Sequence, residues 1–236
     1  LCLQNGVINE HKYQAAFGER KVIAGTVTSA MGRRGVADIT IDRARGVGVA
    51  LGHIFSEQII SDLSAGGINT LGYLQDASMK WSKVVSNLFG NASSAILNMT
   101  PAEIYASDTG YEIEYRMIRE ANQVIRKAGH QLVKLPGTPM HLLGLGLRIL
   151  PAFALHPLLT QQVAGGRGKK MPSLHIDLHA GRPQSEVRFL NGAARDLGSE
   201  LSIPTPVNRG LTRILKAIAA GELSLETYAG KPEKLL

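Results

Sequence analysis

The sequence is poor in cysteine and in aromatic residues, and each shortage excludes a class of protein. Cys2 is the single cysteine among 236 residues, so no internal disulfide can form and a reducing compartment suits the chain. We therefore expect a cytoplasmic protein. Aromatic residues make up 5% of the chain and the basic residues are dispersed in pairs, although the net charge is +7. Few rings are left to stack on bases, so we expect no nucleic-acid partner.

The amino-terminal end lacks the features of a signal peptide. Residues 1–7, LCLQNGV, form an apolar run that ends in a turn, without a charged leading region or a cleavage pattern. The chain starts with leucine, which indicates a start inside a domain. The longest apolar run, residues 140–159, is interrupted by Arg148, Pro151, His156 and Pro157. We expect a buried or dimer-facing helix pair there and no membrane span.

The pattern of apolar and turn residues changes at about residue 74. Before it, LCLQNG, KVIAGTVTSA, GVADITID and RGVGVALG predict short strands, while INEHKYQAAFG and SEQIISDLSAGG predict helices. After it, we find almost no strand signal. Helices are predicted at 76–98, 101–129, 138–164, 171–180, 184–201 and 206–219. A hydrophobic content of 44% supports a real core, and we predict two domains, 1–74 and 75–236.

A polar stripe runs through residues 79–91, MKWSKVVSNLFGN. Lys83, Asn87 and Asn91 recur every four residues, so on a helix their side chains would lie within roughly 80° of one another. Asn98 would fall inside the same wedge. A solvated helix face usually carries longer charged residues, whereas Asn is a poor helix former with paired donors and an acceptor. Spacing alone leaves a solvated face and a ligand-facing stripe open.

Three apparent motifs lack the context that their chemistry needs. GVGVALG at 46–52 and GLGLRI at 144–149 contain glycines typical of phosphate loops, but we expect neither at a strand-to-helix turn of a βαβ unit. HIDLH places His175 and His179 at helical spacing, without the glutamate and third ligand of helical zinc motifs. We expect surface histidines and no metal site.

Three separated segments together resemble the ketopantoate reductase family, also called 2-dehydropantoate 2-reductases. They are LQNGV at 3–7, KWSKVVSNLFGNASSAILN at 80–98 and PSLHIDLHAGRPQSEVRFLNGAARDLGSELSIPTPVN at 172–208. Their order and spacing cover nearly the whole chain. The resemblance implies an α/β tail of a Rossmann-type NADPH-binding domain at 1–74. It also implies an all-α substrate-binding domain at 75–236, similar to the 6-phosphogluconate dehydrogenase C-terminal domain.

The resemblance gives the polar stripe a role. Lys83 matches the family's catalytic lysine, and Asn87 and Asn91 match two substrate-binding asparagines. Hydride addition to a ketone builds negative charge on the carbonyl oxygen, which a cation able to donate a proton stabilises. Carboxamides orient a small polar acid without adding net charge. The hydride itself would come from the cofactor.

Three further residues are implied by the same resemblance. Asn5 matches the residue that approaches both the nicotinamide ribose and the substrate. Ser173 and Glu186 match a substrate-binding serine and glutamate from later helices, and Glu186 is also expected at the cofactor. A carboxylate there could hold Lys83 and accept a hydrogen bond from a substrate hydroxyl.

The chain departs from the family pattern in three places. After Asn98 the family commonly has Asn-Gly-Glu-Leu, whereas this chain reads MTPAEI, and the gap from Ser173 to Glu186 is one residue longer. The family's glycine-rich phosphate loop is absent from the sequence, so we expect this polypeptide alone neither to bind NADPH tightly nor to turn over.

The resemblance implies that the chain is the carboxyl-terminal part of an NADPH-dependent reductase, which converts 2-dehydropantoate to (R)-pantoate for pantothenate and coenzyme A synthesis. The departures keep a related 2-oxo acid reductase open. A non-catalytic helical dimerisation module is the alternative from a different class, and a homodimer stays open in either case.

Overall fold

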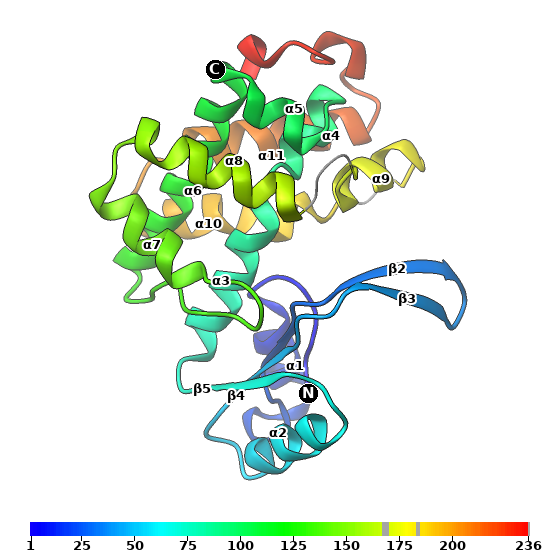
Figure 1. The fold of residues 1–236 in the computed structure, drawn as a ribbon, viewed down its shortest axis with the longest axis vertical. Coiled ribbons are helices and arrows are strands. Elements are labelled where there is room, and N and C mark those ends of the chain that lie inside the picture. The colour runs from blue at the N-terminus through cyan, green and yellow to red at the C-terminus, as the bar shows by residue number, and fades with distance from the viewer. Residues whose placement is uncertain (167–169, 183–184, 236) are drawn as a thin grey trace. The chain divides into compact units, whose positions relative to one another are not determined.

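The computed structural model describes residues 1–166, 170–182 and 185–235. It contains two compact units, drawn in Figure 1. The first consists of Leu1–Val84 and His130–Gly144, and the second of Val85–Gly129 and the residues from Leu145 onward. Helix α3 (Asp76–Leu88) and helix α7 (Met140–Ile149) each run from one unit into the other. The functional division at residue 74 stays a prediction.

The first unit is built on a three-stranded sheet in the order β1-β4-β5. The strands are β1 (Gly25–Val27), β4 (Val47–Ala50) and β5 (Thr70–Tyr73). β1 is antiparallel to β4, whereas β4 and β5 are parallel and are joined by α2 (Ser56–Ala65). The apolar face of α2 packs on the buried valines of β4, which forms the core of this unit. The strands predicted in KVIAGTVTSA and RGVGVALG are thereby confirmed, and β5 is an additional one. The strand predicted in LCLQNG is wrong, because this segment forms only an isolated bridge between Cys2 and Ala24.

The β4–α2–β5 connection is a βαβ unit, so our expectation that GVGVALG lies outside one is wrong. Gly48 lies inside β4, where an added Cβ would lie 2.8 Å from the sulfur of Met79 and 2.9 Å from the ring of Tyr73. Gly52 follows the strand with φ +94°, a conformation that side chains disfavour. Gly48 therefore serves close packing. GLGLRI lies inside α7, away from any strand-to-helix turn.

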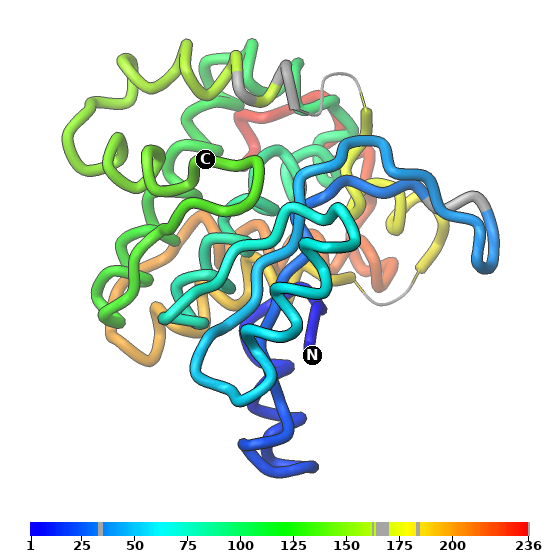
Figure 2. Tube along the Cα trace, turned by 60° about the horizontal axis from the view of Figure 1, so that its bottom comes forward, coloured from blue at the N-terminus to red at the C-terminus, as the bar shows by residue number. Residues whose placement is uncertain are grey.

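A hairpin extends from the first unit. Within the described residues, strands β2 (Ala30–Gly35) and β3 (Asp38–Arg43) pair only with each other, as an antiparallel hairpin (Figure 1 and Figure 2). Before the sheet, the predicted amino-terminal helix is present as α1 (Asn9–Phe17), followed by the short 3-10 helix η1 (Glu19–Lys21).

The second unit is helical among its described residues. Its elements are α4 (Ala92–Leu97), α5 (Pro101–Ala106), α6 (Asp108–Lys127), α8 (Ala152–Gly166), α9 (Ser173–His179), η2 (Glu186–Phe189), α10 (Asn191–Glu200), α11 (Pro206–Ala219), η3 (Leu225–Thr227) and η4 (Pro232–Leu235). The buried face of α6 packs on α10 and α11, which also pack on each other. In the described part of the chain, no helix has both the length and the apolarity needed to cross a membrane.

The four longest predicted helices are each two helices, so those boundaries are wrong. The segment 76–98 breaks at Gly90, which has φ +58°, and 101–129 breaks at Ser107, whose hydroxyl accepts a hydrogen bond from Gly110 N. The segment 138–164 breaks at Pro151, and 184–201 becomes η2 and α10, with residue 184 outside the described residues. In contrast, 206–219 is confirmed as α11, and 171–180 is confirmed as α9 within two residues at each end.

Candidate functional site

Helix α3 carries the first two residues of the polar stripe. Lys83 and Asn87 lie four residues apart and are both partly buried. The other faces of this helix bury Trp81, Val84 and Leu88 in the core. The fold therefore places an ammonium group and a carboxamide on one side of a well-packed helix, as the spacing predicts.

The stripe does not continue on the same helix, and our expectation of one continuous face is wrong. Gly90 ends the run after α3, and Asn91 becomes the N-cap of α4. Asn98 ends α4 in the left-handed region, with φ 50° and ψ 40°. The helical projection of the later asparagines fails because it assumes a helix through Gly90.

Asn91 joins the start of α9 to the break between α3 and α4. The residue is 2% exposed. Its side-chain amide donates to the carbonyl oxygen of Asn87 at 3.0 Å, and its Oδ1 accepts from Leu174 N at 3.1 Å. Ser173, the first residue of α9, directly precedes Leu174 in the sequence and is exposed. The buried carboxamide of Asn91 thus joins the backbone of Asn87 to the start of α9, which carries Ser173.

Glu186 lies on a different element of the second unit. It is exposed at the start of η2, which packs on α10 and α11. Ser185, the residue before it, caps this short helix by accepting a hydrogen bond from Val187 N at 3.3 Å. Its predicted roles at Lys83 and at the cofactor stay predictions.

The HIDLH segment forms most of α9. The rings of His175 and His179 stack with centroids 4.0 Å apart, and His175 Nε2 donates to Asn98 Oδ1 at 2.8 Å. His179 is exposed as expected, but His175 is partly buried, which the sequence did not predict. Burial lowers the pKa of His175, and the neighbouring His179 lowers it further. Across the described residues, no three His, Cys, Asp or Glu side chains are grouped to hold a metal ion.

Asn5 lies in the first unit, shortly after the start of the chain. Cys2 forms an isolated parallel bridge with Ala24, and Asn5 follows this bridge by three residues. Its carbonyl oxygen accepts a hydrogen bond from Asn9 Nδ2 at 2.9 Å, and the residue is exposed. Nucleotides bind at the carboxyl ends of strands in Rossmann-type sheets, so the position of Asn5 fits a nicotinamide cofactor.

Three buried charged residues were missed by the sequence reasoning. Lys80 on α3 forms a 2.6 Å ion pair with Glu10 of α1. Glu114 of α6 is fully buried and accepts hydrogen bonds from Gly90 N at 2.8 Å, Ser93 Oγ at 2.5 Å and Tyr105 Oη at 3.0 Å. The position of Lys80 between Met79 and Trp81 was a signal of burial, whereas Glu114 lies among other charged residues of α6 and has no such local signal.

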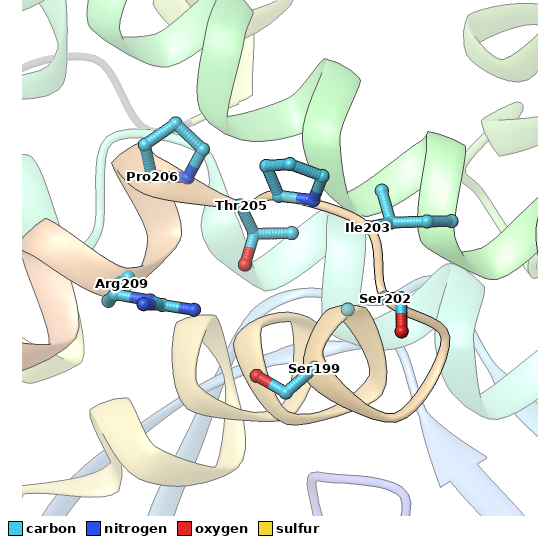
Figure 3. Close-up of a pocket in the computed structure, with 8 residues that line it drawn as sticks. Ser199, Ser202, Ile203, Thr205, Pro206 and Arg209 are labelled. Carbon is cyan, nitrogen blue, oxygen red and sulfur yellow. The ribbon is translucent and has the colours of Figure 1, made fainter.

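A separate hollow of about 550 Å³ lies between the end of α10 and the start of α11 (Figure 3). It is lined by Gly198, Ser199, Ser202, Ile203, Pro204, Thr205, Pro206 and Arg209. None of the six predicted site residues lines it. The hollow therefore adds no group to the candidate site.

The sequence of residues 77–219 matches the family model described as the C-terminal part of ketopantoate reductase PanE/ApbA. A 2-dehydropantoate 2-reductase of Streptococcus pyogenes is 24% identical over 228 residues, which cover 92% of this chain. The same alignment covers 66% of the relative, so the chain spans just under two thirds of its length.

Solved structures have the same fold. A PanE/ApbA family ketopantoate reductase from Ralstonia eutropha superposes with a TM-score of 0.75 at 21% identity, over 94% of this chain and 66% of that one. D-mandelate dehydrogenase, solved with NADH and anilino(oxo)acetate, superposes with a TM-score of 0.73 at 18% sequence identity. The superposition covers 94% of this chain and 67% of that one. A dimeric ketopantoate reductase from Staphylococcus aureus superposes with a TM-score of 0.71 at 16% sequence identity, over 94% of this chain and 68% of that one. The predicted fold class, a Rossmann-type part followed by a helical domain, is thereby confirmed.

Proposed function

The chain belongs to the ketopantoate reductase family, and on this premise we propose that the protein containing it reduces a 2-oxo acid with a nicotinamide cofactor. The family match over residues 77–219, which include the Lys83–Asn87–Asn91 series, carries this proposal. The specific reaction we propose is the NADPH-dependent reduction of 2-dehydropantoate to (R)-pantoate. The name of the Streptococcus pyogenes relative supports this choice of substrate.

In this reaction the nicotinamide would supply the hydride, and the chain's own residues would do the rest. Lys83 would donate a proton to the carbonyl oxygen and stabilise the negative charge that develops there. Asn87, Asn91 and Ser173 would orient the acid through hydrogen bonds. The bonds of Asn91 to Asn87 O and Leu174 N fix the orientation of its carboxamide in advance.

Asn5 and Glu186 would complete the binding groups. Asn5, three residues after the parallel bridge of Cys2 with Ala24, would contact both the nicotinamide ribose and the substrate. Glu186 would contact a substrate hydroxyl and the cofactor. Both residues are exposed in the structure and therefore accessible to ligands.

A related 2-oxo acid reductase is the second candidate, and the start of α5 favours it. Thr100 and Glu103 form a capping box, in which Thr100 N donates to Glu103 Oε2 at 2.7 Å and Glu103 N donates to Thr100 Oγ1 at 3.2 Å. Pro101 or Ala102 stands where the family commonly has a substrate-binding asparagine, and in this structure Pro101 is buried and Ala102 is partly buried. A substrate without a polar group to pair with that asparagine would fit this apolar replacement better.

We also propose a cytoplasmic homodimer as the working assembly. The exposed apolar side chains of α7 and α8 support a protein interface, and the structural neighbour from Staphylococcus aureus is dimeric. The non-catalytic alternative would keep this interface and lose ligand binding.

The deciding experiment measures kcat/KM of the full-length polypeptide that contains this chain. 2-Dehydropantoate and a series of branched and aromatic 2-oxo acids would each be tested with NADPH and with NADH. We expect 2-dehydropantoate with NADPH to give the highest value, and Lys83→Met to lower kcat by about 100-fold or more. A preference for another 2-oxo acid would support the second candidate, and no turnover of any acid would support the non-catalytic module.

A further inference from the structure

Lys80 is a buried lysine that the proposed chemistry does not use. Its side chain is 5% exposed, and the Glu10 side chain that pairs with it is 8% exposed. The ammonium Nζ lies 2.6 Å from Glu10 Oε1, and it donates to the carbonyl oxygens of Gln4 at 2.7 Å and Gly25 at 3.1 Å. The ammonium therefore donates two hydrogen bonds to carbonyl oxygens and forms an ion pair with Glu10, whose Oε1 accepts no hydrogen bond within the described residues. Lysine is rarely buried this completely, and then it is paired.

The three partners come from three segments of the first unit. Gln4 directly precedes Asn5, Glu10 lies on α1, and the third partner begins β1. Lys80 itself lies on α3, three residues before Lys83. At this spacing the two side chains project from the same side of the helix. The ammonium group therefore joins the backbone that carries Asn5 to the helix that carries Lys83.

Stability alone gives little reason for this arrangement. A buried ion pair is often no more stabilising than a well-packed apolar pair of similar volume, because both charges must leave water. An ion pair with two further hydrogen bonds to carbonyl groups does, however, fix the distance between the segments that it joins. The burial and the three partners of Lys80 fit a positional role.

We propose that Lys80 is a positioning residue, which sets the separation between Asn5 and Lys83. This inference rests on the proposed reductase function. Lys80 does not act on the reacting atoms, because its ammonium group pairs with Glu10 and with two carbonyl groups inside the unit. Its loss would let the turn at Asn5 move relative to α3, and a displacement of about 1 Å can lower a rate on the order of 100-fold.

The test compares Lys80→Met with the double variant Lys80→Met/Glu10→Gln in the full-length polypeptide. The single variant leaves the Glu10 carboxylate buried without its cation, so we expect a lower melting temperature and a lower kcat. The double variant removes both charges, so its melting temperature should return toward the wild-type value. Its kcat should stay on the order of 100-fold below wild type, with KM for the 2-oxo acid little changed. Recovery of kcat together with stability would overturn the proposal.

Ser78 on the same helix offers a matched control. Its hydroxyl accepts a hydrogen bond from Gln131 N at 3.3 Å and takes no part in the Lys80 cluster. Ser78→Ala should therefore lower the melting temperature and leave kcat unchanged. A fall in kcat as large as that of the double variant would show that any loosening of α3 impairs the enzyme, and would overturn a specific role for Lys80.

Hydrogen exchange separates this inference from the proposed function. Wild-type protein without reductase activity would refute the function, but the connection made by Lys80 could still be measured. The backbone amides of residues 3–7 should exchange faster in the double variant than in wild type, because their link to α3 is lost. Equal exchange rates in the two proteins would overturn the inference, whatever the activity.

Discussion

His175 is the residue of α9 whose protonation the fold disfavours. Burial lowers its pKa below the usual 6.5, and the charge on His179 lowers it further. Below pH 6.5 the unfolded chain therefore binds more protons at this position than the folded chain, so the free energy of unfolding falls as pH decreases toward the folded pKa. We expect wild type to lose more stability than His175→Gln between about pH 7 and pH 5, in urea unfolding at several pH values.

His179→Gln provides the control for this prediction. It removes the second cause of the lowered pKa and leaves the burial of His175, so its stability should fall less steeply with decreasing pH than that of wild type. Parallel stability curves for wild type and His175→Gln would contradict the assignment.

The sequence predicts a candidate residue well where its environment is local. Lys83 and Asn87 lie on one helix as their spacing indicates. Asn91 and Asn98 do not, because Gly90 adopts a positive φ and ends the run. Lys80 was missed because its acceptors Gln4 and Gly25 lie 76 and 55 residues away in sequence. Such contacts exist only after the chain has folded.

The break between α3 and α4 depends on Glu114 of α6. The carboxylate accepts from Gly90 N and from the hydroxyls of Ser93 and Tyr105, all inside the second unit. In Glu114→Gln an amide N–H group must face one of these donors. Because hydrogen bonds to a charged acceptor contribute about 1.5–3 kcal/mol, we expect the free energy of unfolding to fall by about 2–3 kcal/mol. Chemical denaturation measures the change.

Glu112→Gln is the matched control on the same helix. Glu112 pairs with Arg116 one turn away on the exposed side of α6. An exposed pair of this kind contributes about 0.3–0.5 kcal/mol, so the control should change stability little. Equal effects of the two substitutions would refute the role of Glu114 in the break.

Helices α7 and α8 carry exposed apolar side chains that a dimer would cover. Ile149 is 65% exposed and Phe153 is 79% exposed, and Leu145 and Leu158 are about half exposed. Phe153→Glu would place a charge in the proposed interface, where an unpaired buried charge is strongly unfavourable. We expect wild type to sediment as a dimer, and Phe153→Glu to weaken the dimer at least about 10-fold.

Phe17→Glu on α1 is the comparison for this surface. Phe17 is also exposed, at 61%, but lies on the first unit. This substitution should leave the sedimentation coefficient unchanged. A monomeric wild type at micromolar concentration, or dissociation caused equally by both substitutions, would contradict the proposed interface.

Element type was more predictable than element ends. The apolar period of α11 predicts its bounds correctly, since proline marks its start. The side chain that caps the start of α11 was not predictable. Glu120 of α6 accepts from Val207 N and Asn208 N at 3.0 Å each, from 87 and 88 residues away. The βαβ unit of β4, α2 and β5 was likewise missed, because strand pairing joins residues that no local pattern relates.

At the scale of the whole molecule, the fold class followed from the resemblance of three segments rather than from periodicity. Periodicity indicates strands before about residue 74 and helices after it, and the structure agrees with that order. It does not indicate that residues 130–144 return to the unit with the strands. Two hydrogen bonds join these residues to α3, from Gln131 N to Ser78 Oγ and from Val133 N to Ser82 Oγ.

The last prediction concerns cofactor binding by residues 1–236 alone. The chain spans 66% of the Streptococcus pyogenes relative, and its sheet contains one βαβ unit, formed by β4, α2 and β5. A Rossmann domain uses two βαβαβ halves and places a glycine-rich turn at the pyrophosphate, whereas Gly48 of this unit serves packing. We therefore expect no saturable binding when NADPH is titrated into residues 1–236 at low micromolar concentration.

The full-length polypeptide should bind NADPH under the same conditions, because it would supply the pyrophosphate-binding turn. Circular dichroism of residues 1–236 is needed as a control, since an unfolded polypeptide would also fail to bind. Saturable low-micromolar binding by the folded polypeptide would show that Asn5 and its neighbours hold the cofactor without a glycine-rich loop. The nicotinamide end would then provide most of the affinity, and the phosphate groups little of it.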